Sequence, residues 1–316
     1  MKSMSSVVRV LGWMLLVTLG FSCAATPSKV REDPSVEARS FDGVDLVRPA
    51  FSLEVRNKLE LNLAEAIRAH EQNPTDEMAA IWHGRRLGYL ARYREAVQVF
   101  GKALASHPQS FKLLRHRGHR YITLRRLDDA IGDLSLASNL TREVPDALEP
   151  DGAPNPSGVP RSTTRSNIEY HLGLALYLAG RFEEALAAWE RCLELSRVND
   201  DMLVAATYWN VLTLWRLGRV QRADELLATI RPQMDILENH DYHELLLLFQ
   251  GVVPENQVMD KLAAEGLGSA TLAYGMGAWN LARGNERPAR EIFASILSNK
   301  TWAAFGYIAA EAELWR

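Results

Sequence analysis

Small and large apolar positions recur along this chain with a period of about 34 residues. Each copy holds, at the same offsets, a glycine, an alanine, a large apolar residue and a second small or apolar residue. The copies are Gly84/Ala96/Phe100/Ala103, Gly118/Ala130/Leu134/Ala137, Gly173/Ala185/Trp189/Cys192 and Gly277/Ala289/Phe293/Ile296. A fixed period of this length predicts a stack of repeated structural units.

Each unit is predicted to be two antiparallel helices joined by a short turn. In the clearest copy, Gly180 marks the turn, and Phe182 and Ala185 begin the second helix. The small residues let the two helices approach closely, and the large residue fills the space between them because packed interiors leave few voids. One pair cannot bury its apolar face alone, so neighbouring pairs must stack.

This pattern resembles the tetratricopeptide repeat family over most of residues 52–316. The resemblance implies an all-α fold, a right-handed superhelical solenoid of helix-turn-helix repeats. It also implies that the first helix of each repeat lines a concave groove, which binds a partner and seldom carries an active site.

The organisation follows from the same resemblance. Residues 51–142 are expected to hold a capping helix, at 53–72, and the N-terminal repeats, and residues 167–316 the C-terminal repeats. Two copies depart from the pattern: Val211 stands where a glycine is expected, and 239–268 are interpreted as a shortened, irregular repeat.

The first 22 residues are interpreted as an export signal. Lys2 and Arg9 give a positive start, and residues 11–21 form an apolar core. That core is too short to span a bilayer as a stable helix, which is typical of a signal peptide.

Cys23 follows this core, and the junction resembles a bacterial lipoprotein signal, which implies that Cys23 is lipidated. By the same resemblance, Ala24 in place of aspartate favours the outer membrane, on the periplasmic side. The alternative is an ordinary secretion signal cleaved near Ala25. Residues 24–50 have early prolines, mixed charge and no sustained apolar period, so they are expected to form a flexible tether.

A proline-rich insertion separates two of the repeats. Gly118 and Gly173 are one period plus 21 residues apart, and the extra residues lie within 143–166. Long loops inside compact domains are uncommon and are usually functional or disordered. Two alternatives remain open for this segment, a floppy surface loop and an ordered flap over the edge of the groove.

The family resemblance also assigns groove positions on this chain. The partner-binding candidates are Arg85, Tyr89, Lys112, Arg115, His119, Tyr170, Tyr177, Tyr208, Trp215, Arg216 and Tyr274, with Asn167 and Thr271 at further groove positions.

The N-terminal half of this groove is expected to be cationic and its middle aromatic. Residues 112–126 contain no acid and six lysines or arginines. Such a groove suits an extended ligand that carries carboxylates, because arginine binds them through two parallel hydrogen bonds and flat rings give rigid contact area. The alternative is a solvated basic face paired with acids such as Asp128, Asp129 and Asp133.

Composition narrows the range of functions. The formal net charge of −3 gives no bulk attraction to nucleic acid. Apart from Cys23 the chain has one cysteine, Cys192, which occupies a small-residue position of a repeat and is expected to be a buried small hydrophobe.

Motifs for catalysis and for metal binding are missing. The chain has no phosphate-binding loop, no nucleophile elbow and no HExxH motif. His116 and His119, like His240 and His243, are spaced for one helical face but have no third ligand in sequence. We therefore expect no enzyme, no cofactor and no metal, with an unrecognised active site as the remote alternative.

The last residues, 301–316, are apolar nearly all round as a helix. A solenoid cap normally has a polar outer face, so this helix is expected to make a contact. One hypothesis is that Tyr307, Leu314 and Trp315 meet a second subunit or a partner. The other is that the helix packs back under the irregular repeat.

The sequence thus predicts a non-catalytic scaffold or adaptor of the bacterial cell envelope that binds a protein segment in its concave groove. The rival hypothesis is that the basic and aromatic groove captures an anionic polymer or small ligand, such as an exported polysaccharide.

Overall fold

The computed structural model describes residues 35–150, 155, 157–264 and 269–316. The predicted signal, Cys23 and the first part of the predicted tether lie outside the described residues. The chain divides into two compact units, residues 1–33 and 34–316, and the description below concerns the second.

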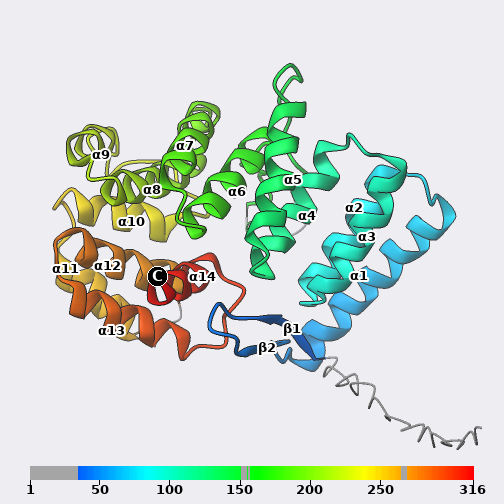
Figure 1. Ribbon diagram of the computed structural model, residues 1–316, viewed down its shortest axis with the longest axis horizontal. Helices are drawn as coiled ribbons and strands as arrows, with labels where there is room; N and C mark the ends of the chain where they lie inside the picture. Colours follow the sequence, from blue (N-terminus) through cyan, green and yellow to red (C-terminus); the bar gives the residue numbers. More distant parts are fainter. Residues whose placement is uncertain (1–34, 151–154, 156, 265–268) are drawn as a thin grey trace, which may run out of the picture. The chain divides into compact units, whose positions relative to one another are not determined.

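The elements of this unit are a β-hairpin and a series of helices (Figure 1). They are β1 (Val36–Arg39), β2 (Asp45–Val47), α1 (Leu53–Gln72), α2 (Glu77–Tyr89), α3 (Tyr93–Ser106), α4 (Phe111–Thr123), α5 (Leu127–Leu140), α6 (Thr164–Leu178), α7 (Phe182–Ser196), α8 (Asp200–Arg216), α9 (Val220–Leu227), α10 (His240–Phe249), α11 (Glu255–Ala264), α12 (Ala270–Ala282), α13 (Glu286–Leu297) and α14 (Phe305–Trp315).

The helices form a solenoid of antiparallel pairs. The pairs are α2/α3, α4/α5, α6/α7, α8/α9, α10/α11 and α12/α13, and most pack against the next pair along the chain. The first helices α2, α4, α6, α8, α10 and α12 also contact one another, and their shared surface is called the inner face below. The helix α1 lies where the sequence predicted a capping helix, against α2.

The recurring glycine is required by close packing inside each pair. A Cβ placed on Gly173 would lie 2.6 Å from the indole of Trp189, and one on Gly118 would lie 2.7 Å from Cγ of Leu134. Real Cβ atoms do not approach other atoms so closely, so these positions admit only glycine without a shift of the neighbouring helix. The sequence period is therefore the signature of one helix contact made repeatedly.

The turn within each pair ends the first helix with a left-handed residue. Gly180 and Gly284 take this conformation with φ of 75° and 80°. Two pairs use other residues, Ala91 and Arg125, with φ of 55° and 61°. A side chain in this conformation costs roughly 1–2 kcal/mol, so Arg125 must make compensating contacts.

Three boundaries differ from the sequence predictions. The predicted tether extended to residue 50, but residues 36–47 form the antiparallel hairpin β1–β2. The hairpin is ordered because it packs: Glu37 is buried and accepts a hydrogen bond from the Arg94 main chain, and Trp302 Nε1 donates to the Val47 carbonyl.

The first C-terminal repeat helix begins at Thr164, inside the predicted insertion, because Thr163 caps it with a capping box. The last helix begins at Phe305 rather than near residue 301.

Every helix among the described residues is too short or too polar to cross a membrane.

Candidate functional site

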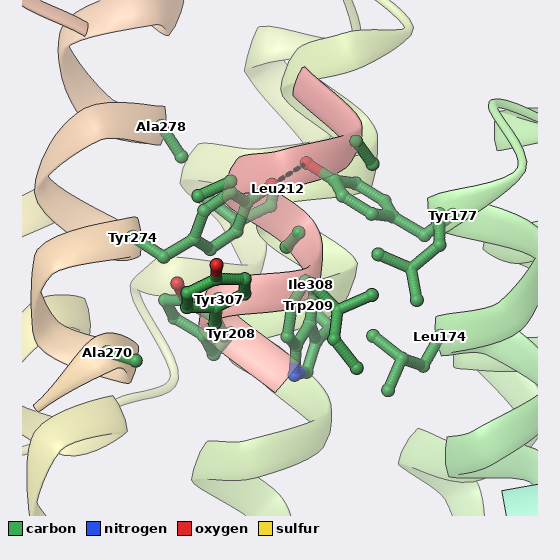
Figure 2. Packing of buried hydrophobic residues seen from close by; sticks show 14 of the residues in the cluster. Leu174, Tyr177, Tyr208, Trp209, Leu212, Ala270, Tyr274, Ala278, Tyr307 and Ile308 are labelled. Atoms are coloured by element: carbon green, nitrogen blue, oxygen red, sulfur yellow. Dashed lines mark hydrogen bonds between the residues drawn. The ribbon is translucent and has the colours of Figure 1, made fainter. Parts of the chain in front are cut away.

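The inner face of the C-terminal repeats is covered by the chain's own last helix. α14 packs against α12, α13 and α6. Its Phe305 ring lies 5.4 Å from that of His119 and 5.7 Å from that of His171, between centroids. Figure 2 shows Tyr307 and Ile308 of α14 among the inner-face side chains of α6, α8 and α12. The helix therefore packs within its own chain, as one hypothesis predicted, but mainly against α12, α13 and α6 rather than under the irregular repeat α10/α11.

The aromatic candidates lie beneath or beside α14. Tyr177, Tyr208 and Tyr274 are fully buried. The hydroxyls of Tyr177 and Tyr274 are hydrogen-bonded at 2.9 Å (Figure 2), and the Tyr170 hydroxyl accepts a hydrogen bond from Trp209 Nε1 at 2.8 Å. Burial raises the pKa of each of these phenols, so they stay neutral. In this state they are core residues, and their predicted role in partner binding stays a prediction.

Two glutamates fix α14 across the inner face. Glu311 pairs with Arg125 at 2.7 Å, and both side chains are only 4% exposed. Glu313 pairs with Arg216 at 3.1 Å and with Arg316 at 2.9 Å. The first pair joins the C-terminal helix to the turn between α4 and α5, and this contact accounts for the left-handed conformation of Arg125.

Trp215 and Arg216, the remaining C-terminal candidates, stay half-buried beside α14. With Tyr177 and Glu313 they line a cavity of about 220 Å³. The Trp215 ring packs against Phe249, 4.8 Å between centroids.

The three residues proposed for a subunit contact have different surroundings. Tyr307 is buried and Leu314 is half-buried, whereas Trp315 is 65% exposed and stacks on Phe41 of the hairpin at 5.8 Å. The predicted subunit contact stays a prediction, and only Trp315 among the three presents most of its surface to solvent.

The inner face of the N-terminal repeats holds a piece of the insertion. The Arg85 guanidinium of α2 donates to the carbonyl of Pro150 at 2.6 Å. Arg115 of α4 pairs with the Glu149 carboxylate at 3.1 Å, and Asn167 of α6 donates to the same carboxylate at 3.1 Å. Of the two alternatives for the insertion, its described residues 147–150 fit the flap, because three inner-face helices hold them.

A small cavity lies between this segment and the helices. Its volume is about 170 Å³, and its lining includes Arg85, Lys112, Arg115, His116 and Glu149. Tyr89 lies next to it, half-buried, and its hydroxyl accepts a hydrogen bond from Arg85 at 3.3 Å. Lys112 lies 3.7 Å from Glu77 and is partly exposed. The structure thus gathers Arg85, Lys112 and Arg115 of the predicted cationic set at one place.

Positive charge exceeds negative charge around this cavity. Burial lowers the pKa of Arg115, an effect that Glu149 partly offsets, and the Arg115 Nε atom has no hydrogen-bond partner. Burial likewise lowers the pKa of Arg120 to about 10. Among the described residues, no carboxylate pairs with Arg120, whose guanidinium instead lies over the Tyr93 ring.

The histidines nearby are neutral. Burial is the main cause that lowers the pKa values of His116, His119 and His171 well below 6.5, and the neighbouring arginines lower them further. His119 is enclosed by His171, 4.3 Å away between ring centroids, and by Phe305. His119 is therefore an interior residue of the groove rather than part of its open surface.

The basic face of α4 and α5 is partly paired, as the alternative to a cationic groove predicted. Arg117 makes two hydrogen bonds to Asp133, and Arg126 pairs with Asp129. These arginines do not line the cavity, whose cations are Arg85, Lys112 and Arg115.

Sequence reasoning missed the acidic partners, Glu149, Glu311 and Glu313. A signal was present, because an acid inside an apolar helix or a proline-rich loop needs a cation when it is buried. The sequence could not predict which cation each acid pairs with, since residues such as Glu311 and Arg125 are far apart along the chain.

No cluster of three or more histidine, cysteine or acidic side chains among the described residues could hold a metal ion. His243 Nε2 instead lies 2.8 Å from the carbonyl of Arg231. Cys192 is buried, and burial raises the pKa of its thiol to about 12.

Residues 167–197 match the family model described as tetratricopeptide repeat. A comparison with curated proteins gives no match.

Among solved structures the chain is similar to YrrB, a TPR protein with an unusual peptide-binding site, at 17% identity and a TM-score of 0.42, covering 75% of this chain and 95% of that one. It is also similar to a tetratricopeptide repeat protein from Parabacteroides merdae, at 15% identity and a TM-score of 0.48, covering 80% and 93%. A third is PilW, a type IV pilus biogenesis factor, at 16% identity and a TM-score of 0.45, covering 79% and 94%. At these values the similarities carry no argument about function.

The family match falls on α6 and α7, where Gly173 packs against Trp189. The equivalent glycine and large residue meet in α2/α3, α4/α5 and α12/α13. Residues 167–197 therefore form a tetratricopeptide repeat, and the same helix contact recurs in three other pairs of the solenoid.

Proposed function

We propose that this protein is a non-catalytic scaffold that binds an extended segment of a partner protein on the inner face of α2, α4 and α6. One observation carries the proposal: this surface already holds an extended stretch of chain, residues 147–150, through Arg85, Arg115 and Asn167. A surface that binds four residues of its own chain has the chemistry to bind a similar segment of another.

The C-terminal inner face is a poorer candidate for this role. Its aromatic side chains are buried by α14, and α14 is fixed by the buried Glu311–Arg125 pair. Opening it would expose the apolar surface of a whole helix, whereas lifting residues 147–150 exposes mainly one carboxylate and its polar partners.

We also propose that the protein works at the periplasmic face of the cell envelope, held in the outer membrane by a lipid on Cys23. The support is the positive start, the short apolar core and the cysteine of residues 1–23. A single acyl chain binds membranes only reversibly, so stable anchoring needs more than one acyl chain on the cysteine. Replacing Cys23 with alanine should move the protein from the membrane fraction to the soluble fraction. Membrane retention of C23A at the wild-type level would contradict lipid anchoring.

The partner proposal is tested by affinity capture from solubilised envelope. The full-length protein should retain a protein that R85E/K112E loses, because both side chains line the cavity and are only partly buried. The matched control is K102E/R197E, which reverses two exposed charges, one on α3 and one directly after the end of α7. Equal capture by R85E/K112E and by the control would move the binding surface elsewhere.

A second candidate function is the binding of an anionic polymer or small ligand. The observation that favours it is the surplus of cations around the cavity, where Arg85, Lys112 and Arg115 line a space whose lining includes one carboxylate, that of Glu149. Capture of no protein, together with retention of an acidic polysaccharide that falls steeply with added salt, would favour this candidate over a protein partner.

A further inference from the structure

The cavity on the N-terminal inner face has the features of a carboxylate site. Glu149 is 8% exposed, and its carboxylate is bound by Arg115 and Asn167, from two different helices. His116 lies 3.8 Å from the same carboxylate. A buried carboxylate with several donors is strongly held, because charged hydrogen bonds are about twice as strong as neutral ones.

The segment around Glu149 is also bonded at the start of α6, where the Thr164 main chain donates to the Ala147 carbonyl and the Arg165 main chain to the Asp146 carboxylate. The neighbouring Leu148 side chain is 60% exposed, and Pro150 contributes only its carbonyl, bound by Arg85. The main chain of Glu149 donates to the Ser162 carbonyl, within the insertion itself. The carboxylate is thus the anchor of the insertion on α4, while Arg85 of α2 and the start of α6 hold its main chain.

The site is not saturated by this single carboxylate. Arg115 lines the cavity with its Nε atom buried and without a partner among the described residues. Arg85 and Lys112 line the same cavity, and both are half-buried. An incoming segment could therefore use more cation contacts than Glu149 does.

We propose that Glu149 is an intramolecular ligand occupying a carboxylate-binding site, and that a partner segment carrying glutamate or aspartate binds by replacing it. This inference rests on the proposed function, and it names the chemistry of the partner segment. The exchange is favourable because one carboxylate leaves as another arrives, so Arg115 is not left as an uncompensated buried charge.

Because Glu149 belongs to the same chain as the site, it competes with a partner segment for that site. A short flexible tether gives an effective concentration in the millimolar range. The apparent affinity for a partner falls by the fraction of molecules in which the site is free. A site occupied by Glu149 in about 90% of molecules would bind a partner about tenfold more weakly than the vacant site.

The experiment uses a fluorescent peptide with the sequence of residues 144–151, Val-Pro-Asp-Ala-Leu-Glu-Pro-Asp, and measures its anisotropy with the full-length protein in detergent. Glu149→Gln should bind the peptide at least tenfold more tightly than wild type. The matched control is Glu143→Gln, which removes an exposed carboxylate of the same insertion and should bind as wild type does.

A second variant guards against a loss of folding in Glu149→Gln. Replacing residues 148–150 with Gly-Ser-Gly keeps the length of the insertion and opens the cavity to water, and it should also bind the peptide at least tenfold more tightly. A peptide with glutamine in place of its glutamate and asparagine in place of both aspartates should bind neither variant.

Two results would overturn the inference. Equal affinity of the peptide for wild type and both open variants would show that Glu149 does not compete. Absence of binding to both folded open variants would show that the vacant cavity is not a carboxylate site. Either result leaves the capture experiment with R85E/K112E standing, so failure of this inference is distinguishable from failure of the proposed function.

Discussion

The ion pair between Arg125 and Glu311 gives the sharpest quantitative prediction, because it joins the last helix to the turn between α4 and α5. Both side chains are 4% exposed. The Arg125 guanidinium also donates to the carbonyls of Thr123, at 2.7 Å, and Trp302, at 2.9 Å, and Glu311 also accepts from the Phe41 main chain. Glu311→Ala leaves the guanidinium buried with two carbonyl partners and no counter-charge.

Removal of one partner from a buried pair costs about 3–5 kcal/mol. In a unit of this size, each kcal/mol lowers the melting temperature by about 2 °C, so we expect Glu311→Ala to melt about 6–10 °C below wild type. The matched control is Asp129→Ala. This variant breaks the exposed ion pair between Asp129 and Arg126, which directly follows Arg125 in the sequence. Exposed ion pairs contribute only about 0–1 kcal/mol to stability.

The assay is thermal unfolding followed by circular dichroism at 222 nm at fixed protein concentration. A double variant, Arg125→Met with Glu311→Met, should recover much of the loss, because it removes both charges together. Equal melting temperatures for Glu311→Ala and Asp129→Ala would refute the reasoning, since they would mean that α14 is not held against the α4–α5 turn.

Three further predictions follow from the packing. Gly173→Ala should lower the free energy of urea unfolding by about 1–3 kcal/mol, because its Cβ would meet Trp189. Gly132→Ala, in an exposed and open part of α5, should raise it by about 0.5–1 kcal/mol. A loss of stability at both positions would contradict the packing argument. His116, His119 and His171 have folded-state pKa values below their unfolded value near 6.5, so the unfolded chain binds more protons and stability should fall as the pH drops below about 6.5, by about 1.4 kcal/mol per pH unit for each. Urea midpoints at pH 7 and pH 5.5 check this slope, which should be shallower in His119→Gln, and a flat profile would mean that these rings are not buried neutral. The Cys192 thiol, whose pKa burial raises to about 12, should react with a thiol reagent only at the rate of unfolding, and rapid labelling of the native protein would place it at the surface.

The repeat itself was predictable because it depends on local contacts. Gly173 and Trp189 lie on consecutive helices, so the spacing of small and large residues along the chain records their contact directly. The cationic N-terminal site was predictable for a similar reason, since the repeat register places Arg85 and Arg115 on equivalent helices.

The register of the repeats could not predict which segments of the chain cover the inner face. The apolar character of residues 301–316 indicated a contact but not its partner, which lies on helices far earlier in the chain. The hairpin was missed because its strands are short and are ordered by tertiary contacts such as Trp302 to Val47. Glu149 was missed because a lone acid in a proline-rich loop gives no periodic signal.

The most direct test of the account is site-specific photocrosslinking of the protein in cells. A photoreactive amino acid in place of Tyr89, which lies beside the cavity, should form an adduct with a partner protein, and one in place of Lys102, exposed on α3, should not. Adducts of equal yield from both positions, or from position 102 alone, would contradict the claim that the inner face of α2, α4 and α6 binds the partner.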